Sequence, residues 1–271
     1  MKIQVLRCAV LTTALMLGHT ASADQLADVK EKGTLVCGVM TNLNPFAFTD
    51  SESQEQVGYD IDFCKGVAEH LGVKPELKVI SFDARIPELN QGGVDILAAV
   101  LGYTEERAKQ IDYSDAYFVS IQKMGVRADS DYKELNDLAG ERIGAVKASS
   151  TLGMLQQTLP TAKVISYDDA PAAFMALVQG KVEGFGQSET LLRQWMSKTP
   201  DQKINVILPP MGQESWGLGL RKNEPAFQQA VNDALAKMES SGESAEIFER
   251  WLGKETAFEM DREFKTQPIT Q

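Results

Sequence analysis

The sequence predicts an α/β protein built from two similar lobes. Apolar, strand-like runs alternate with amphipathic stretches over residues 35–101, and the same alternation starts again at residue 142. A short internal match supports a duplicated architecture: Leu-Asn-Gln-Gly-Gly-Val-Asp at 89–95 recurs as Leu-Val-Gln-Gly-Lys-Val-Glu at 177–183. In both places a helix would end at glycine and lead into a strand. We therefore expect two βαβ lobes with parallel strands rather than one long sheet.

The elements of each lobe follow from hydrophobic periodicity. In the first lobe the expected order is strand 35–40, helix 60–71, strand 77–80, helix 86–90 and strand 95–101. In the second lobe it is strand 142–146, a helix from about 151, strand 163–166, helix 170–179, strand 182–185 and helix 190–196. Open α/β sheets bind ligands beyond the carboxyl ends of their strands, which places a site at the loops after 98–101 and 185–187.

The end of the chain is expected to return to the first lobe. Residues 224–238 and 244–251 have the pattern of amphipathic helices that pack there. The return requires two crossings between the lobes, and strands near 119–123 and 215–219 would form a hinge that closes over a ligand. The expected division is therefore residues 24–119 and 217–271 in lobe 1 and residues 120–216 in lobe 2.

The first 23 residues have the pattern of a secretory signal peptide. Lys2 and Arg7 precede an apolar run at 9–17, and Ala21-Ser22-Ala23 forms a small-residue cleavage site. The apolar run is shorter than the roughly 20 residues that span a bilayer, which disfavours a membrane anchor. Cys8 precedes the apolar run and lacks the context of a lipid-modified cysteine. We expect cleavage after Ala23 and a soluble, exported chain.

Charge and cysteine usage fit an exported binding module. Removal of the signal deletes two positive charges and shifts the formal net charge from −11 to −13, which disfavours nucleic acid and anionic membranes as partners. Cys37 and Cys64 remain, an even number in an oxidising compartment. Both lie in apolar patterns that face one core, so a disulfide is expected. Two buried thiols are the alternative, because the sequence does not give the distance between the two Cα atoms.

Arg107 is the candidate anion ligand. Thr104 is expected to cap a helix whose first turn carries Glu105, Glu106 and Arg107. A cation at the positive end of a helix is unfavourable unless an anion joins it, and arginine with free backbone N–H groups makes a carboxylate clamp. A surface arginine paired with the neighbouring acids is the alternative.

Other local signals are weaker. Residues 147–151 supply hydroxyls and backbone donors, Ser149 and Ser150 among them, at a strand-to-helix junction where plain capping is the alternative. Phe46, Phe48 and Phe82 are candidates for an apolar wall or for the core.

Enzymatic and metal-binding motifs have little support. His70 is the only histidine after residue 23, the cysteines lack zinc spacing, and no phosphate loop or dinucleotide fingerprint occurs. We therefore expect neither a metal nor a cofactor. Acid–base catalysis by carboxylates alone stays open.

The chain resembles the polar amino-acid-binding proteins of bacterial ABC importers, solute-binding protein family 3, over nearly all of residues 33–252. The resemblance rests on several segments in the same order and spacing: Pro45-Phe46, Gly58 to Asp62, Phe82 to Pro87, Thr104 to Arg107 running into Ile111 to Asp115, and Ile143 to Val146. It implies the two-lobed periplasmic-binding-protein fold. It also implies a location in the periplasm, a membrane permease as partner, and an amino acid or related small carboxylate as ligand.

The resemblance also assigns roles to residues. Arg107 would hold the ligand's α-carboxylate, with help from the backbone at Gly102 and from Ser149 and Ser150, and Phe82 would form an aromatic wall. Some relatives carry cysteines at the positions of Cys37 and Cys64, where they are paired.

Three departures from the family pattern concern the site. Leu43 stands where an aromatic residue usually precedes the Pro-Phe pair, and Gly102 stands where threonine or serine is common. Ser188 stands where the family places the acid that neutralises the ligand's α-amino group. A serine does not offset a buried positive charge. Either Glu189 or another acid replaces that partner, or the ligand is a carboxylate without an α-ammonium group.

The sequence thus indicates a binding protein that is not an enzyme and that delivers a solute to an ABC importer. The alternative is a dehydratase of the cyclohexadienyl type, because some dehydratases share this fold and use acids rather than histidine. A sensor that acts through a partner protein is a third reading.

Overall fold

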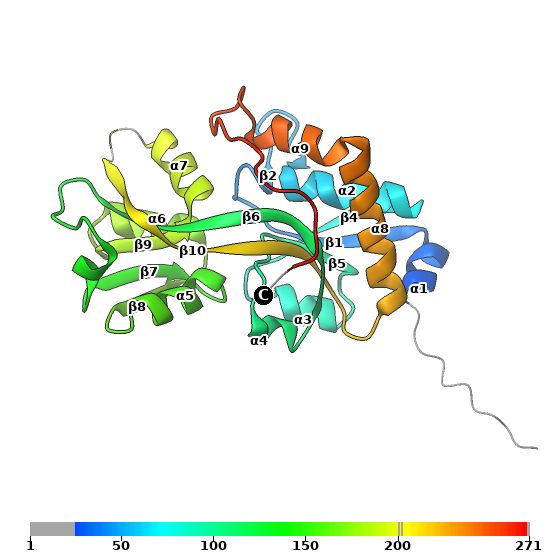
Figure 1. Cartoon of the computed structure of the whole chain (residues 1–271), viewed down its shortest axis with the longest axis horizontal. Coiled ribbons are helices and arrows are strands. Elements are labelled where there is room, and N and C mark those ends of the chain that lie inside the picture. Colours follow the sequence, from blue (N-terminus) through cyan, green and yellow to red (C-terminus); the bar gives the residue numbers. More distant parts are fainter. Residues whose placement is uncertain (1–24, 200, 202, 270–271) are drawn as a thin grey trace, which may run out of the picture.

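The protein was analysed as a computed structural model that describes residues 25–269 except 200 and 202. Two lobes lie side by side and are joined by two long strands that run through both (Figure 1). The described strands form one continuous sheet of eight in the order β4-β1-β5-β10-β6-β9-β7-β8, with a separate hairpin of β2 (Phe48–Thr49) and β3 (Gln56–Val57). The predicted α/β architecture with two lobes is confirmed, but the strands of the lobes are not in separate sheets, because the crossing strands β10 and β6 pair with one lobe each and with one another. The predicted signal peptide lies outside the described residues.

The first lobe is built from both ends of the described chain. Its strands are β1 (Thr34–Val39), β4 (Lys74–Val79) and β5 (Ile96–Ala98), and β1 pairs in parallel with the other two. Its helices are α1 (Gln25–Lys32), α2 (Tyr59–Leu71), α3 (Arg85–Asn90), α4 (Glu105–Ala108), α8 (Pro225–Ser241) and α9 (Glu243–Leu252). Helix α2 ends at Gly72, which adopts a left-handed conformation that glycine tolerates without strain. Helices α8 and α9 pack on α2, as their amphipathic patterns predict.

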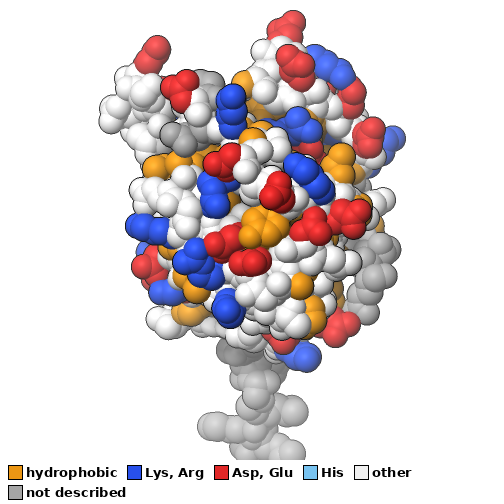
Figure 2. Space-filling model, turned by 90° about the vertical axis from the view of Figure 1, so that its left-hand side faces the viewer, with side chains coloured by type: hydrophobic (Ala, Val, Ile, Leu, Met, Phe, Trp, Pro, Cys, Tyr) orange, Lys and Arg blue, Asp and Glu red, His pale blue; other side chains and the backbone are white. Residues whose placement is uncertain are grey.

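The second lobe repeats the parallel arrangement. Strand β7 (Arg142–Val146) lies between β8 (Lys163–Tyr167) and β9 (Gly184–Ser188). Helices α5 (Ser150–Thr158), α6 (Ala170–Val178) and α7 (Glu189–Lys198) and a short 3-10 turn at Leu135–Leu138 complete it. The outer face of this lobe carries acidic and basic side chains interspersed with one another (Figure 2).

The two crossing strands are longer than the sequence predicts. Strands β6 (Asp112–Arg127) and β10 (Ile204–Leu220) pair antiparallel, with a break in register between Ile207 and Gly212. They extend beyond the expected 119–123 and 215–219 because each also serves as a strand of the lobes, β10 beside β5 and β6 beside β9. The predicted lobe boundaries at 119/120 and 216/217 fall inside these strands and stay a prediction.

Cys37 of β1 and Cys64 of α2 form a disulfide, as expected. Their Cα atoms lie 6.3 Å apart, within the range that a disulfide spans, and both side chains are buried in the core of the first lobe. The bond ties the central strand of that lobe to the helix that covers it. No helix among the described residues is long and apolar enough to cross a membrane.

Candidate functional site

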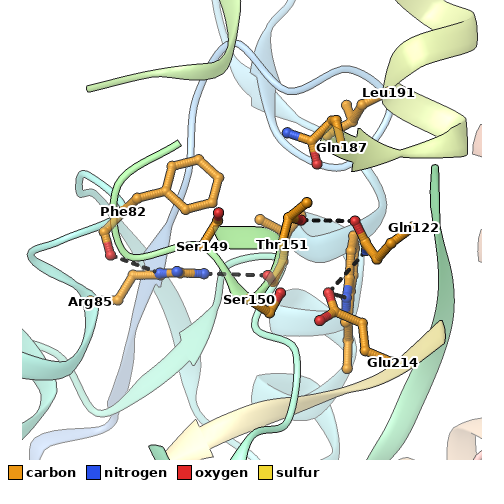
Figure 3. Close-up of a pocket in the computed structure, with 11 residues that line it drawn as sticks. Phe82, Arg85, Gln122, Ser149, Ser150, Thr151, Gln187, Leu191 and Glu214 are labelled. Carbon is orange, nitrogen blue, oxygen red and sulfur yellow. Dashed lines mark hydrogen bonds between the residues drawn. The ribbon is translucent and has the colours of Figure 1, made fainter. Parts of the chain in front are cut away.

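A pocket of about 300 Å³, counting the part that opens to solvent, lies between the two lobes beside the crossing strands. It is lined by residues from both lobes and from both crossing strands: Phe82, Arg85, Val100, Gln122, Ser149, Ser150, Thr151, Gln187, Leu191, Glu214 and Trp216. The loop after β5 supplies Val100 and the end of β9 supplies Gln187. The pocket therefore lies at the two loops that the strand pattern indicates, beyond the carboxyl ends of parallel strands (Figure 3).

Arg107 reaches the boundary between the lobes from the short helix α4. Thr104 caps this helix, since its Oγ1 accepts a hydrogen bond from the Arg107 backbone N at 3.2 Å. The Arg107 side chain is 9% exposed, and its Nη1 donates to the Gly102 carbonyl at 2.6 Å. Its Nη2 donates to the Ala148 carbonyl of the other lobe at 2.7 Å. The guanidinium thus lies where the lobes meet.

Arg85 is a second buried arginine, for which the sequence pattern predicts no role. It is 2% exposed, and its guanidinium carbon lies 4.6 Å from the centre of the Phe82 ring. Its Nε donates to the Phe82 carbonyl, its Nη1 to the Ala99 carbonyl and its Nη2 to the Ala148 carbonyl, at 2.9–3.0 Å. Burial, with the nearby charge of Arg107, lowers the pKa of Arg85, yet a guanidinium stays protonated at any physiological pH. All three nitrogens of Arg85 have carbonyl acceptors, so it holds the loops of the pocket in place.

The second lobe presents the start of helix α5 to these arginines. Ala148 precedes the helix with φ of 54°, and Ser149 caps it, its Oγ accepting from the Leu152 backbone N at 3.2 Å. A helix start carries partial positive charge and unpaired N–H groups. Two guanidinium groups and this helix start therefore favour an anion in the pocket.

A polar network joins the crossing strands to the second lobe. Thr151 Oγ1 donates to Gln122 Oε1 at 2.9 Å, and Gln122 Nε2 donates to Glu214 Oε1 at 3.2 Å. Trp216 Nε1 donates to the same oxygen of Glu214 at 2.7 Å. Burial raises the pKa of Glu214, while bonds from Ser150 and Trp216 and the charges of the two arginines oppose that rise. The network places an acid among the residues that line the pocket (Figure 3).

Asp60 supports the pocket from behind. It is fully buried in α2, and its two carboxylate oxygens accept from the Tyr117 hydroxyl at 2.7 Å and from the Val100 backbone N at 2.8 Å. Val100 lines the pocket with φ of 46°, a conformation that a β-branched residue rarely adopts. The Asp60 carboxylate thus stabilises a strained backbone at the pocket wall.

The structure brings most of the predicted site residues together. Phe82, Ser149 and Ser150 line the pocket, whereas Arg107, Gly102 and Thr104 are not among its lining residues. Gly102 packs against the pocket residue Glu214, Arg107 binds the carbonyls of Gly102 and Ala148, and Thr104 caps the helix of Arg107. Two others are placed elsewhere. Leu43 is 1% exposed in the core of the first lobe. Ser188 is buried at the start of α7, where its Oγ accepts from the Leu191 backbone N at 3.4 Å.

Several pocket residues were not singled out from the sequence. Gln122, Glu214 and Trp216 come from the crossing strands, where an isolated polar or aromatic residue carries no local signal. Arg85 lies in the segment Phe82 to Pro87, one of those on which the family resemblance rests. A charged residue between Ala84 and Ile86 was the sequence feature that could have indicated a role for it. Among the described residues, no group of three or more His, Cys, Asp or Glu side chains is arranged to hold a metal ion.

Comparison with known families decides the classification. Residues 35–254 match the model of the bacterial extracellular solute-binding proteins, family 3. The chain belongs to this family. Among relatives of this family-3 protein is the glutamine-binding protein of an ABC transporter of Bacillus subtilis, which is 29% identical over 86% of each chain.

Solved structures agree with the family assignment. An ancestral arginine-binding protein bound to arginine is 32% identical to this family-3 protein, with a TM-score of 0.76 over 82% of this chain and 99% of the other. An ancestral amino acid-binding protein described as a precursor of cyclohexadienyl dehydratase is 27% identical, with a TM-score of 0.77 over 85% of this chain and 100% of the other.

Proposed function

We propose that this family-3 protein binds an amino acid or a closely related small carboxylate between its lobes and delivers it to the membrane permease of an ABC importer. The observation that carries the proposal is the Arg107 guanidinium, buried at the lobe boundary and directed at the start of α5. Relatives named for binding glutamine and arginine support an amino acid as the ligand class.

In this proposal Arg107 binds the ligand's carboxylate. Its Nη2 now donates to the Ala148 carbonyl, and a carboxylate is a stronger acceptor for the same donor because it is charged. Ser149 and Ser150 would add hydroxyl or backbone donors from the second lobe, and Gly102 would add its backbone N–H. Phe82 would cover the ligand as an apolar wall, while its other contact, with Arg85, keeps its ring in place.

The remaining predicted residues act indirectly. Thr104 would hold Arg107 by capping α4, Ser188 would fix the start of α7 beside Leu191, and Leu43 would support the wall from the core. The lobes would separate by bending at β6 and β10, with the boundaries given above, to admit the ligand.

The proposal includes export to the periplasm. Residues 1–23 would serve as a signal peptide cleaved after Ala23, and the disulfide of Cys37 with Cys64 fits an oxidising compartment. Mass spectrometry of the chain purified from a periplasmic extract tests this. A mass that begins at Asp24 supports cleavage, and a mass that includes the first 23 residues contradicts it.

We propose that the protein does not turn over its ligand. One observation favours the alternative of a cyclohexadienyl-type dehydratase: Glu214 is a buried acid with a raised pKa in the pocket, a property of general acids. The similar precursor of such an enzyme is itself described as an amino acid-binding protein, which favours binding over turnover. Incubation with a cyclohexadienyl acid, followed by absorbance of an aromatic product, decides between them, and product formed in proportion to enzyme would support the dehydratase.

The binding proposal is tested by isothermal titration calorimetry of the chain from Asp24 with the twenty L-amino acids and with carboxylates that lack an amino group. We expect Arg107→Ala to weaken the tightest ligand about thirtyfold or more, because truncation of one partner of a buried charge pair costs about 2–5 kcal/mol.

Arg142→Ala is the matched control. Arg142 pairs with Glu183 at the far end of β7, and its side chain is 49% exposed, so its removal should leave affinity unchanged. Equal affinities of the wild type and Arg107→Ala would show that the carboxylate clamp is misassigned.

A further inference from the structure

Glu214 is the one carboxylate among the residues that line the pocket. Its Oε1 accepts hydrogen bonds from Trp216 and Gln122, and the Ser150 hydroxyl interacts with the carboxylate. Its Oε2 is buried, and among the described residues no lysine, arginine or histidine forms an ion pair with the carboxylate. Figure 3 shows the carboxylate beside Ser150, facing the space between the lobes. A buried carboxylate that lacks an ion-pair partner is costly, and a positively charged group of a ligand would offset that cost.

Gly102 makes room for this carboxylate. A Cβ atom added at Gly102 would lie 2.4 Å from both Cδ and Oε2 of Glu214, closer than real Cβ atoms come to other heavy atoms. Its φ lies outside the left-handed range, so close approach rather than backbone conformation explains the glycine. The Glu214 carboxylate thus fills the space that a side chain at position 102 would occupy, so the acid at 214 requires the glycine at 102.

The acid and the carboxylate clamp meet at the same residue. Arg107 Nη1 donates to the Gly102 carbonyl at 2.6 Å, while the Glu214 carboxylate packs against the Gly102 Cα. An anion site and a cation site are therefore separated by about the width of one residue. This spacing suits a zwitterion whose carboxylate and ammonium groups are attached to one carbon atom.

The other acids near the pocket are already occupied. Glu189 lies 2.5 Å from Arg193 and 3.9 Å from the buried Lys123. Asp60 accepts from the Tyr117 hydroxyl and the Val100 backbone N on the far side of the pocket wall. Neither lines the pocket, which leaves Glu214 as the acid placed to receive a cation.

We propose that Glu214 binds the ammonium group of the ligand and so makes the site selective for amino acids over carboxylates that lack an amine. This inference rests on the proposed function, in which Arg107 binds the ligand's carboxylate. It also explains how the pocket holds an ammonium group although Ser188, at the usual position of the acid, is neutral.

The test compares each amino acid with its desamino analogue on wild type and Glu214→Gln. The probes are L-glutamine with 5-amino-5-oxopentanoate and L-arginine with 5-guanidinopentanoate, together with the tightest ligand of the calorimetric screen and its analogue. We expect the wild type to prefer the amino acid by at least about thirtyfold, the ratio set by about 2 kcal/mol. In Glu214→Gln the amino acid should weaken by a similar factor, and the analogue should change less than about threefold.

Two further variants test whether the loss of amino-acid affinity is specific to the Glu214 carboxylate. Glu189→Gln removes the rival acid and should leave both ligands unchanged. Ser188 lies between the pocket residues Gln187 and Leu191 in the sequence, so an acid at this position would be next to the pocket. Ser188→Asp, placed in the Glu214→Gln background, should therefore restore part of the lost amino-acid affinity. Retained binding of the desamino analogue shows that Glu214→Gln is folded.

The outcomes separate this inference from the proposed function. Equal weakening of both ligands, or no weakening of either, in Glu214→Gln would overturn the role of Glu214 while leaving a carboxylate-binding protein. Wild-type affinity that is the same with and without the amine would do likewise. If no amino acid and no analogue binds the wild type, the proposed function itself fails.

Discussion

Asp60 is a buried acid whose environment favours the neutral form. Burial raises its pKa from 3.8 to about 7, although the bonds from Tyr117 and Val100 and the charge of Arg85 act in the opposite direction. Because the folded-state pKa exceeds the unfolded-state value, the native protein binds more protons than the unfolded chain between about pH 4 and 7. The stability contributed by neutral Asp60 is therefore present below pH 4 and is lost as the pH rises through 7.

Asp60→Asn should remove this pH dependence. The asparagine keeps an acceptor for the Val100 backbone N and does not ionise. We expect the free energy of unfolding of the variant, relative to that of the wild type, to be higher at pH 8 than at pH 4 by up to about 4 kcal/mol. The reason is that each unit of pKa shift corresponds to about 1.4 kcal/mol. Urea unfolding at the two pH values measures the difference. Parallel pH profiles of the two proteins would contradict it.

At the scale of elements, the first lobe depends on a covalent link between β1 and α2. Cys37 and Cys64 are 27 residues apart in the sequence, so their disulfide closes a loop that the unfolded chain would otherwise sample freely. The chain-entropy estimate for a loop of that length is about 3.5 kcal/mol. The link also places Asp60, one turn before Cys64, against the pocket wall.

Replacement of both cysteines by alanine should therefore lower the free energy of unfolding by about 3.5 kcal/mol or more. Both side chains are fully buried, so the double variant tests the link together with a small loss of packing. Urea titration of the variant beside the wild type in reducing buffer distinguishes the two effects, because reduction removes only the bond. A loss below about 1 kcal/mol in both cases would show that packing alone holds β1 to α2.

At the scale of the molecule, the C-terminal segment returns from α9 across the first lobe to the crossing strands (Figure 1). Arg262 forms a two-pronged pair with Glu239 of α8 at 2.6 and 3.0 Å, and Gln267 pairs with Ala116 of β6. Phe264 packs on Phe118 of the same strand. The segment thus closes the first lobe over the base of β6.

Arg262→Ala should loosen this segment in a pH-dependent way. Partial burial by itself raises the pKa of Glu239. The bonds from Arg262 and from the Thr266 backbone outweigh this effect, so the pKa falls from 4.5 to about 2. A lowered folded-state pKa contributes stability that is present above pH 4.5 and is lost as the pH falls towards 2. We expect the variant to melt a few degrees lower at pH 7 and the gap to narrow at pH 3, by scanning calorimetry.

Arg250→Ala is the control for that experiment. Arg250 pairs with Asp62 on the surface, where an exposed ion pair contributes little to stability. A gap for Arg262→Ala that stays constant with pH would mean that the segment is held by its aromatic contacts and not by the ion pair.

The sequence by itself determined the parts of this protein that local pattern encodes. The sequence did not predict α1 or the β2–β3 hairpin. It did predict the other α-helices and the strands of the main sheet, the two lobes, the threonine cap before Arg107 and the pairing of the cysteines. Each depends on periodicity, capping or composition within a few residues, or on a resemblance carried by contiguous segments. The extra length of the crossing strands was missed, because the same residues serve both a lobe and the connection.

Only the tertiary structure decided which charged groups share the pocket. Gly102 and Glu214 are 112 positions apart, and Arg85 meets Ala148 across 63. No local pattern relates such residues. From the sequence alone, Glu214 in an apolar strand would be expected at the surface. The fold instead packs it against Gly102 and near two buried arginines. The proposed selectivity would arise from that placement, because the partial loss of water around a charge depends on every element that packs on it.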